Sequence, residues 1–460
     1  MLSTITRKWA LFLGPLIATV TTIALIKIGW PTERAVTLGI TLLTAIWWIF
    51  EPIPIPVTSM LPLALFPILG ILSADQIGQS YGSPLILLLL GGFILSTALA
   101  KNNAHLRIAI GMVRLFGQNS KRGLVFGFMV AAAALSMWIS NTATTLMLLP
   151  VALAIIDSSG DKKLVVPLLL GIAYAASVGG IGTPIGTPPN LIFMKVYGDF
   201  IGAEIGFTHW MTWGVPVVLV FVPIIAIWLT RNLSGKGVYT LPEHTPWSSA
   251  EKRVMIVFAL TALTWMTRKE PFGGWSVLFG LPNASDGSVA LLAVVALFLV
   301  PNGKGGKLLD WSSANNIPWG VLLLFAGGIS IAKAFTVTGL SQIIGDALSV
   351  FTHIHVLLLI MALALCVTFL TELTSNTATT TLLMPILAAT ALSVEMDPLI
   401  LMVPAALSAS CAFMLPVATA PNAVIFGSER IAIDRMIKEG FVLNLLGTLI
   451  ITGICYVLLT

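Results

Sequence analysis

Long apolar runs alternate with short polar segments along almost the whole chain of 460 residues. Eleven runs are candidate membrane crossings, near residues 10–28, 35–50, 56–72, 83–100, 164–182, 211–230, 254–267, 289–300, 318–336, 399–416 and 441–459. Because a helix needs roughly 20 apolar residues to cross a bilayer, the pattern predicts an all-α integral membrane protein with about eleven transmembrane helices.

Two further apolar segments, near 123–157 and 356–393, are each interrupted at the centre by the same polar hexapeptide, SNTATT. The first copy spans residues 140–145 and the second spans residues 375–380. Non-helical backbone is tolerated at membrane depth only where protein buries it or where it lines a cavity. We therefore expect two re-entrant helical hairpins with SNTATT at their tips.

The repetition extends beyond the hexapeptide. Three features recur in the same order at offsets of 236, 235 and 232 residues: the glycine pairs 91–92 and 327–328, the SNTATT copies, and the motifs GTPPN and TAPN that end at Asn190 and Asn422. This spacing predicts two homologous halves. We expect an N-terminal segment at 1–82, a first repeat at 83–230, a connecting segment at 231–317 and a second repeat at 318–460.

The composition and charge distribution support this membrane topology. Only 9% of the residues are charged and the mean hydropathy is +0.98, whereas soluble domains carry about 25% charged residues. With the N-terminus in the cytoplasm, 18 Lys and Arg residues fall inside and five fall outside, as the positive-inside rule requires. The C-terminus is then outside, and the two repeats are inverted in the membrane.

The two tips and the two Gly/Pro-rich breaks that follow them carry the candidate chemistry. Hydroxyl, amide and backbone carbonyl oxygens are neutral hard donors that suit a small cation. Helix N-termini and Asn or Thr donors suit an anion. Helix capping is the structural alternative for a single SNT motif, but two symmetric copies favour binding. Apart from Lys195, no Lys or Arg lies beside these segments, so bound cations would supply the anion's countercharge.

Two acidic residues remain open to more than one interpretation. Glu372 lies beside the second tip, where the first repeat has Met137. It is a candidate proton site or a hydrogen-bonded structural acid. Glu51 lies at the end of a span, before a Pro-rich break, and this position favours a structural role.

Other classes of function find no support in the sequence. It contains no Walker, GxSxG or HExxH motif, so we expect neither an enzyme nor an organic cofactor. The basic residues form no stripe with interleaved aromatic residues, so we expect no nucleic-acid partner.

The segments SNTATTLMLLP, TELTSNTATTTLLMP, GTPIGTPPN and MLPVATAPNAVIFGS closely resemble those of the divalent anion/sodium symporter family, in particular its INDY-type members. The segments FEPIPIPVTSMLP and NNAHLRIAI are similar to further signatures of that family. The resemblance extends over essentially the whole chain. It implies a homodimer in which each protomer has a scaffold domain and a transport domain, the latter holding both hairpins and moving as an elevator.

The resemblance also implies the binding residues. The first sodium site would comprise Ser136, Ser140, Asn141 and the backbone of Gly186, and the second Thr371, Ser375, Asn376 and the backbone of Ala418. The carboxylate substrate would contact Asn141, Thr142, Thr187, Pro188, Asn376, Thr377 and Thr419. One departure is Ala420, which stands where the first repeat has Pro188, and it leaves the preferred anion open.

The resulting expectation is a symporter that carries C4-dicarboxylates such as succinate, malate and fumarate with sodium into the cell across a bacterial inner membrane. Within the same family, a dicarboxylate exchanger and a citrate or sulfate carrier are alternatives. Proton coupling through Glu372 is another possibility. From a different class, an ion channel remains an alternative.

Overall fold

The computed structural model describes residues 4–117, 120–235, 246–269, 273–340, 343 and 355–460. Within these ranges the chain is helical, apart from turns and one isolated bridge between Pro301 and Lys307. The helices are α1 Thr4–Lys27, α2 Thr32–Phe50, α3 Ile55–Thr58, α4 Met60–Ile68, α5 Ala74–Tyr81, α6 Pro84–Lys101, α7 Ala104–Gly117, α8 Lys121–Ser136, α9 Asn141–Ser159, α10 Val165–Gly179, η1 Gly180–Gly182, α11 Pro188–Ile201, α12 Phe207–Thr230, α13 Ser249–Met266, α14 Gly274–Leu278, α15 Asp286–Leu299, α16 Trp311–Ala314, α17 Trp319–Thr338, α19 Val356–Thr371, α20 Asn376–Ser393, α21 Leu399–Ser408, α22 Ala420–Phe426 and α23 Ile433–Leu459.

The prediction of an all-α protein with several apolar helices is confirmed. In the described part of the chain, eight helices are long and apolar enough to cross a membrane, and shorter apolar helices lie at 55–68, 286–299, 356–371 and 399–408. The total of eleven crossings stays a prediction, because length and composition alone do not decide whether the shorter helices span the bilayer.

The structure differs from the expected spans in three places. The predicted span at 399–416 is helical only as far as Ser408, where α21 ends and an unwound segment begins. The helix α23 starts at Ile433, eight residues before the predicted span, because its first turns carry charged residues that a hydropathy pattern excludes. The basic stretch after Lys101, which lies outside the predicted spans and hairpins, contains α7, whose amphipathic sequence packs one side on α8.

Glu51 has the structural role that its position suggested. It ends α2 in the left-handed conformation, with φ of 46°, and its N–H donates to the carbonyl of Trp47. Its carboxylate lies 3.5 Å from the guanidinium of Arg7. The residue therefore closes α2 and ties it to α1.

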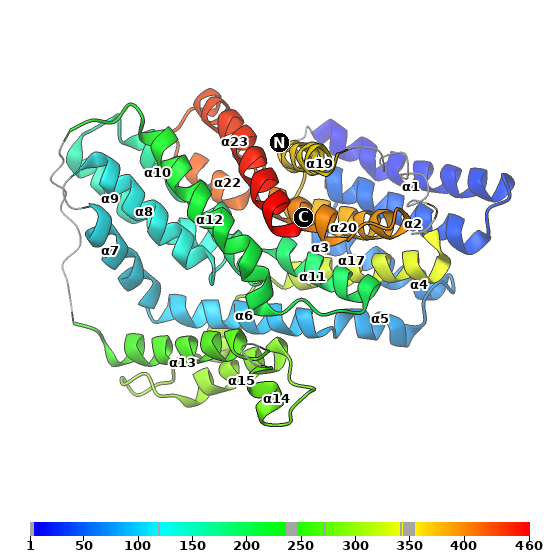
Figure 1. The fold of residues 1–460 in the computed structure, drawn as a ribbon, viewed down its shortest axis with the longest axis horizontal. Coiled ribbons are helices and arrows are strands. Elements are labelled where there is room, and N and C mark those ends of the chain that lie inside the picture. Colours follow the sequence, from blue (N-terminus) through cyan, green and yellow to red (C-terminus); the bar gives the residue numbers. More distant parts are fainter. Residues whose placement is uncertain (1–3, 118–119, 236–245, 270–272, 341–342, 344–354) are drawn as a thin grey trace.

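The helices that follow the two SNTATT copies, α9 and α20, each pack on a helix of the other repeat. The helices α13, α14 and α15 form a layer at one edge, and α6 separates most of that layer from the rest (Figure 1). In the interior, α9 of the first repeat packs on α22 of the second, and α20 of the second packs on α11 of the first. Each broken helix therefore packs against the hairpin helix of the other repeat.

Candidate functional site

The first SNTATT copy begins α9, directly after a four-residue turn that follows α8. The hydroxyl of Ser140 caps α9 by accepting a hydrogen bond from the N–H of Ala143 at 3.2 Å. The hydroxyl of Ser136 donates to Oδ1 of Asn141 at 2.5 Å, and the hydroxyl of Thr145 donates to the Asn141 carbonyl at 2.9 Å. Ser136 therefore holds the Asn141 side chain, and Thr145 holds its backbone carbonyl.

The second copy begins α20 and repeats this arrangement. The hydroxyl of Thr371 donates to Oδ1 of Asn376 at 2.6 Å, and Thr380 donates to the Asn376 carbonyl at 2.7 Å. The same Thr371 hydroxyl shares its proton with the carbonyl oxygen of Ala409, 3.1 Å away, which links the tip to the break between α21 and α22. Ser375 makes no capping hydrogen bond, so the capping role of Ser140 is not repeated.

The first broken helix consists of α10, the short helix η1, an unwound turn at 183–187 and α11. Asn190 Nδ2 donates to the carbonyl of Gly180 at 3.0 Å and to that of Thr183 at 2.7 Å. A methyl group built on Gly180 would lie 2.6 Å from Asn141 Oδ1 and 3.1 Å from the Gly186 carbonyl oxygen. The tip amide and the turn that holds Gly186 thus meet at Gly180, which has room for no side chain.

The second broken helix consists of α21, the unwound segment 409–419 and α22. Asn422 Nδ2 donates to the carbonyls of Ala412 and Leu415 at 3.0 and 3.1 Å. These acceptors lie 232 positions after Gly180 and Thr183, the same offset that separates the two asparagines. The side chain of Thr419 caps α22 by accepting the N–H of Asn422 at 3.3 Å. The internal repeat therefore extends to individual hydrogen bonds.

Glu372 holds the second unwound segment to its hairpin. Its Oε1 accepts the N–H groups of Phe413 and Met414 at 2.7 and 2.9 Å, and its Oε2 accepts that of Leu415 at 3.0 Å. Asn444 Nδ2 donates to Oε1 at 2.7 Å. A buried carboxylate with four donors is well suited to a structural role, the second of the two interpretations left open by the sequence.

The predicted binding residues fall into two groups, one around each tip. Ser136, Asn141 and Gly186 converge at Gly180, while Thr371 and Asn376 meet beside Ala409. Ala418 is buried and directly precedes Thr419, the cap of α22. The remaining predicted residues, in the first turns or at the caps of the four helices that begin at the tips and breaks, are Ser140, Thr142, Thr187, Pro188, Ser375, Thr377 and Thr419. Within the described residues, no hydrogen bond joins Asn141 to Asn376, so their meeting at one site stays a prediction.

Three side chains of this region were not predicted as site residues. Asn190 and Asn422 were used only as marks of the repeat, although their recurrence after a Pro was itself a signal. Asn444 lies on α23, outside every motif, and no pattern in the sequence could have linked it to Glu372. Its contact depends on the packing of α23 against α19.

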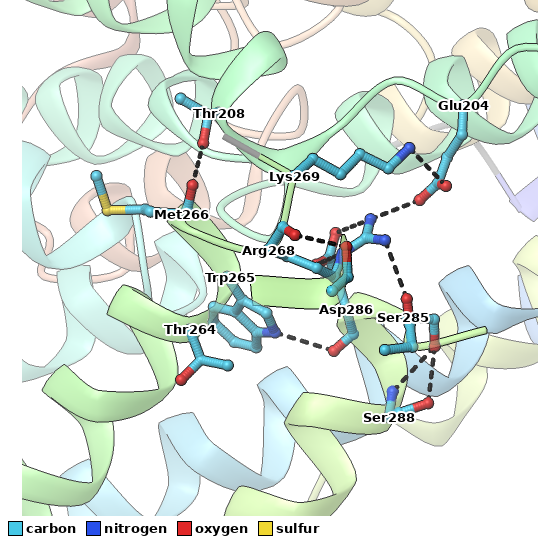
Figure 2. A network of polar contacts seen from close by, with 12 residues as sticks. Glu204, Thr208, Thr264, Trp265, Met266, Arg268, Lys269, Ser285, Asp286 and Ser288 are labelled. Carbon is cyan, nitrogen blue, oxygen red and sulfur yellow. Dashed lines mark hydrogen bonds and ion pairs between the residues drawn. The ribbon is translucent and has the colours of Figure 1, made fainter. Parts of the chain in front are cut away.

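Lys195 is not a countercharge for the tips. It forms an ion pair with Asp199 on the next turn of α11, and both line a cavity of about 480 Å³. The same cavity is lined by an ionic cluster of Glu204, Arg268, Lys269 and Asp286, which we name the outer ionic cluster (Figure 2). Opposite charges pair within this lining, so the cavity has no surplus of positive charge for an anion.

The outer ionic cluster joins three stretches of chain: the α11–α12 loop, the end of α13 and the start of α15. Arg268 is buried and is held by Asp286, with Nε 2.5 Å from Oδ1, while its Nη2 lies 2.7 Å from Oε1 of Glu204. Lys269 Nζ lies 2.8 Å from Oε2 of Glu204. The hydroxyl of Thr208, at the start of α12, donates to the carbonyl of Met266 at 2.9 Å. These contacts tie the α11–α12 loop to the end of α13 (Figure 2).

Paired hairpins and paired broken helices inside a bundle of apolar helices define the protein as a membrane transporter, since such interruptions build the binding sites of secondary transporters. A profile of the citrate transporter family matches residues 45–405. The chain belongs to this family. The relatives in it are transporters and not enzymes.

Curated relatives make the match more specific. The chain is 38% identical to the sodium-dependent dicarboxylate transporter SdcS of Staphylococcus saprophyticus, over 97% of this chain and 90% of that protein. The SdcS proteins of Staphylococcus aureus strains are similar to the same degree, with the same coverage.

Two solved transporter structures share the fold. The Alcanivorax borkumensis YdaH transporter aligns with a TM-score of 0.60 and 14% identity, over 92% of this chain and 98% of that one. Neisseria gonorrhoeae MtrF, described as an antimetabolite efflux pump, aligns with a TM-score of 0.57 and 13% identity, over 86% and 84% of the two chains. At such identities the likeness concerns the fold alone.

Proposed function

We propose that this chain is a sodium-coupled symporter that carries C4-dicarboxylates such as succinate, malate and fumarate into the cell. The observation that carries the proposal is the matched pair of tips. At each, a hydroxyl fixes an Asn amide beside an unwound segment rich in carbonyl oxygens. Such neutral oxygen donors bind a small hard cation and also release it. The similarity to sodium-dependent dicarboxylate transporters supports the same function.

Coupling follows from the charges around the tips. An anion bound between them would have no lysine or arginine beside it in the SNTATT segments or breaks, and Lys195 is paired with Asp199. Burying such an anion uncompensated is very costly. Sodium ions at the tips supply the missing positive charge, so the dianion and its cations bind and cross together.

The transport step in this proposal is an elevator movement. Residues 1–82 and 231–317 belong to a scaffold that forms a homodimer, and the repeats at 83–230 and 318–460 supply the moving domain with its two re-entrant hairpins. The N-terminus is cytoplasmic and the C-terminus outside, in a bacterial inner membrane. The positive-inside count supports this orientation, and the packing of α13 on α15 supports the grouping of the connecting segment as one unit.

Uptake of labelled succinate into proteoliposomes tests the function. Uptake is expected only with an inward sodium gradient, and unlabelled malate and fumarate are expected to compete. Because the matching family is described as citrate transporters, the competition panel includes citrate, together with 2-oxoglutarate, sulfate and phosphate. Stronger competition by citrate than by succinate would reverse the substrate preference. Uptake that ignores sodium but requires internal dicarboxylate would indicate an exchanger, and non-saturable current would indicate a channel.

A further inference from the structure

Asn190 and Asn422 are fully buried and make matching contacts in the two repeats. In each, both N–H bonds of the amide donate to carbonyls of the unwound segment just before it. Their Oδ1 atoms have no hydrogen-bond partner among the described residues. Leaving a buried carbonyl oxygen unpaired is costly, yet the asparagine is present in both repeats. The two hydrogen bonds that Nδ2 donates are therefore the contacts that each side chain contributes.

The amide nitrogens reach the predicted sodium ligands through one shared acceptor. The Thr183 carbonyl accepts from Asn190 and also from the N–H of Gly186, at 3.3 Å. In the second repeat the Leu415 carbonyl accepts from Asn422 and also from the N–H of Ala418, at 3.2 Å. Gly186 and Ala418 are the residues whose backbone oxygens are expected to bind sodium.

Each asparagine therefore stabilises a turn whose backbone lacks the hydrogen bonds of a regular helix. A carbonyl outside a helix keeps its direction only if some donor fixes it. Asn190 fixes Gly180 and Thr183, and Asn422 fixes Ala412 and Leu415. The turns 183–186 and 415–418 can then present their backbone oxygens without reorganising when an ion arrives or leaves.

We propose that Asn190 and Asn422 are positioning residues of the two cation sites, which hold the backbone oxygens of Gly186 and Ala418 in a geometry suited to sodium. The proposal rests on the proposed sodium-coupled function. Neither asparagine is among the proposed ligands of sodium or substrate. Loss of either should change the affinity and selectivity for the cation, without a direct effect on substrate recognition.

The test replaces each asparagine by alanine and uses a matched control. Asn102 Nδ2 also bridges two backbone carbonyls, those of Ala98 and Leu308, at 2.8 and 2.9 Å, but it lies after α6, away from both tips. Succinate uptake by reconstituted N190A, N422A and N102A is measured against sodium concentration, and again with lithium in place of sodium. Succinate KM is measured at saturating sodium.

We expect N190A and N422A each to raise the half-maximal sodium concentration about tenfold or more and to lower the preference for sodium over lithium. N102A is expected to leave both quantities unchanged. Lower maximal rates in N190A and N422A, with sodium dependence and selectivity as in N102A, would mean a purely structural role and overturn the proposal. Wild-type protein without sodium activation would instead overturn the proposed function and this inference with it.

A second pair of variants covers poor folding. Asn190→Ser and Asn422→Ser keep one small donor, so each is expected to give a sodium shift between those of wild type and the alanine variant. Serine variants that fold and match wild type in sodium dependence and lithium discrimination would also contradict the proposal.

Discussion

The two repeats share most of the contacts at their tips and breaks but differ in part of what supports them. In both, a hydroxyl donates to a tip asparagine and a later asparagine ties two carbonyls. A hydrogen bond from an aromatic side chain to a backbone carbonyl of each break also matches. The carbonyl of Ile181 accepts from the indole of Trp210, and that of Phe413, 232 positions later, accepts from the hydroxyl of Tyr174. The shared contacts are those that shape the oxygen-lined sites.

The supports differ in chemistry. In the first repeat Met137 packs against Gly182, and the Thr183 hydroxyl donates to the Met137 carbonyl. In the second repeat Glu372 stands at the position of Met137 and accepts three backbone N–H groups. The glycine-rich break is therefore held by close packing, and the glycine-poor break is held by a buried carboxylate.

The repeats also differ in what anchors the loop after the broken helix. In the first repeat that loop is tied to the end of α13 through the outer ionic cluster and Thr208. In the second repeat Arg430 pairs with Asp157 at 3.1 Å, at the end of the first hairpin. The first loop thus contacts the proposed scaffold, while the ion pair of the second loop joins two parts of the proposed moving domain. The two repeats therefore share their hydrogen bonds near the tips and differ in how the following loops are attached.

The largest effect is expected from fixing the first loop in place. With Cys366 replaced by serine, cysteines at Thr208 and Met266 are joined by a short bifunctional thiol reagent. If this contact lies between a moving and a fixed domain, the bridge should abolish uptake while sodium-dependent succinate binding remains. The remaining cysteines, Cys411 and Cys455, are buried. The readout is uptake and binding before and after bridging.

The second repeat supplies the control for that experiment. A cysteine pair at Asp157 and Arg430 joins two parts of the proposed moving domain, so bridging it should leave uptake largely intact. Full activity of the bridged 208–266 protein would show that α12 and α13 move together, and the proposed division would fall.

The difference in supports predicts unequal stability effects. Glu372→Ala leaves four buried donors without their acceptor, which should cost about 3–5 kcal/mol. Met137→Ala, at the equivalent position, removes only a partly buried apolar side chain and should cost about 1–2 kcal/mol. Thermal unfolding in detergent compares the two. Equal losses would refute the assignment of the carboxylate as the main support of the second break.

Proton coupling through Glu372 is tested separately on the wild-type protein. Because the carboxylate is occupied by four donors, a pH gradient without sodium should drive no succinate uptake. Uptake under those conditions would restore Glu372 as a proton-site candidate.

These differences mark the limit of what the sequence could predict. Apolar periodicity was enough for most of the long helices, and the repeated SNTATT was enough to locate the starts of α9 and α20. The contacts that distinguish the repeats depend on tertiary packing. Asn444 reaches Glu372 only because α23 packs beside α19, and the partners of Arg268 lie on separate elements. Helix α7 was missed because its charges lie at regular spacing on one face and reduce its mean hydropathy.

A smaller but more local effect is expected at Gly180. A Cβ there would lie 2.6 Å from Asn141 Oδ1, so Gly180→Ala must displace the tip amide. Overpacking of this kind costs about 1–3 kcal/mol, equivalent to roughly 5- to 150-fold in affinity, and should raise the half-maximal sodium concentration within that range. The second repeat already has Ala412 at this position, so Ala412→Gly should have little effect. Equal shifts in both variants would mean that the two cation sites are built alike.

The smallest effect is expected at Glu204, the exposed member of the outer ionic cluster. Glu204→Gln weakens a contact that is about as strong as surface ion pairs, at most about 1 kcal/mol, so the uptake rate should change no more than about fivefold. Burial raises the pKa of Glu204, but the pairs with Lys269 and Arg268 outweigh it and leave the pKa below its usual range. The ion pairs of Glu204 therefore contribute their full stabilisation at any pH above the ordinary carboxyl pKa, about 4.3. This stabilisation is lost as the pH falls through the lowered pKa of Glu204. The ratio of wild-type to Glu204→Gln uptake rates should therefore stay constant from pH 8 to about pH 5. A ratio that varied within this interval would show that another titrating group controls the contact.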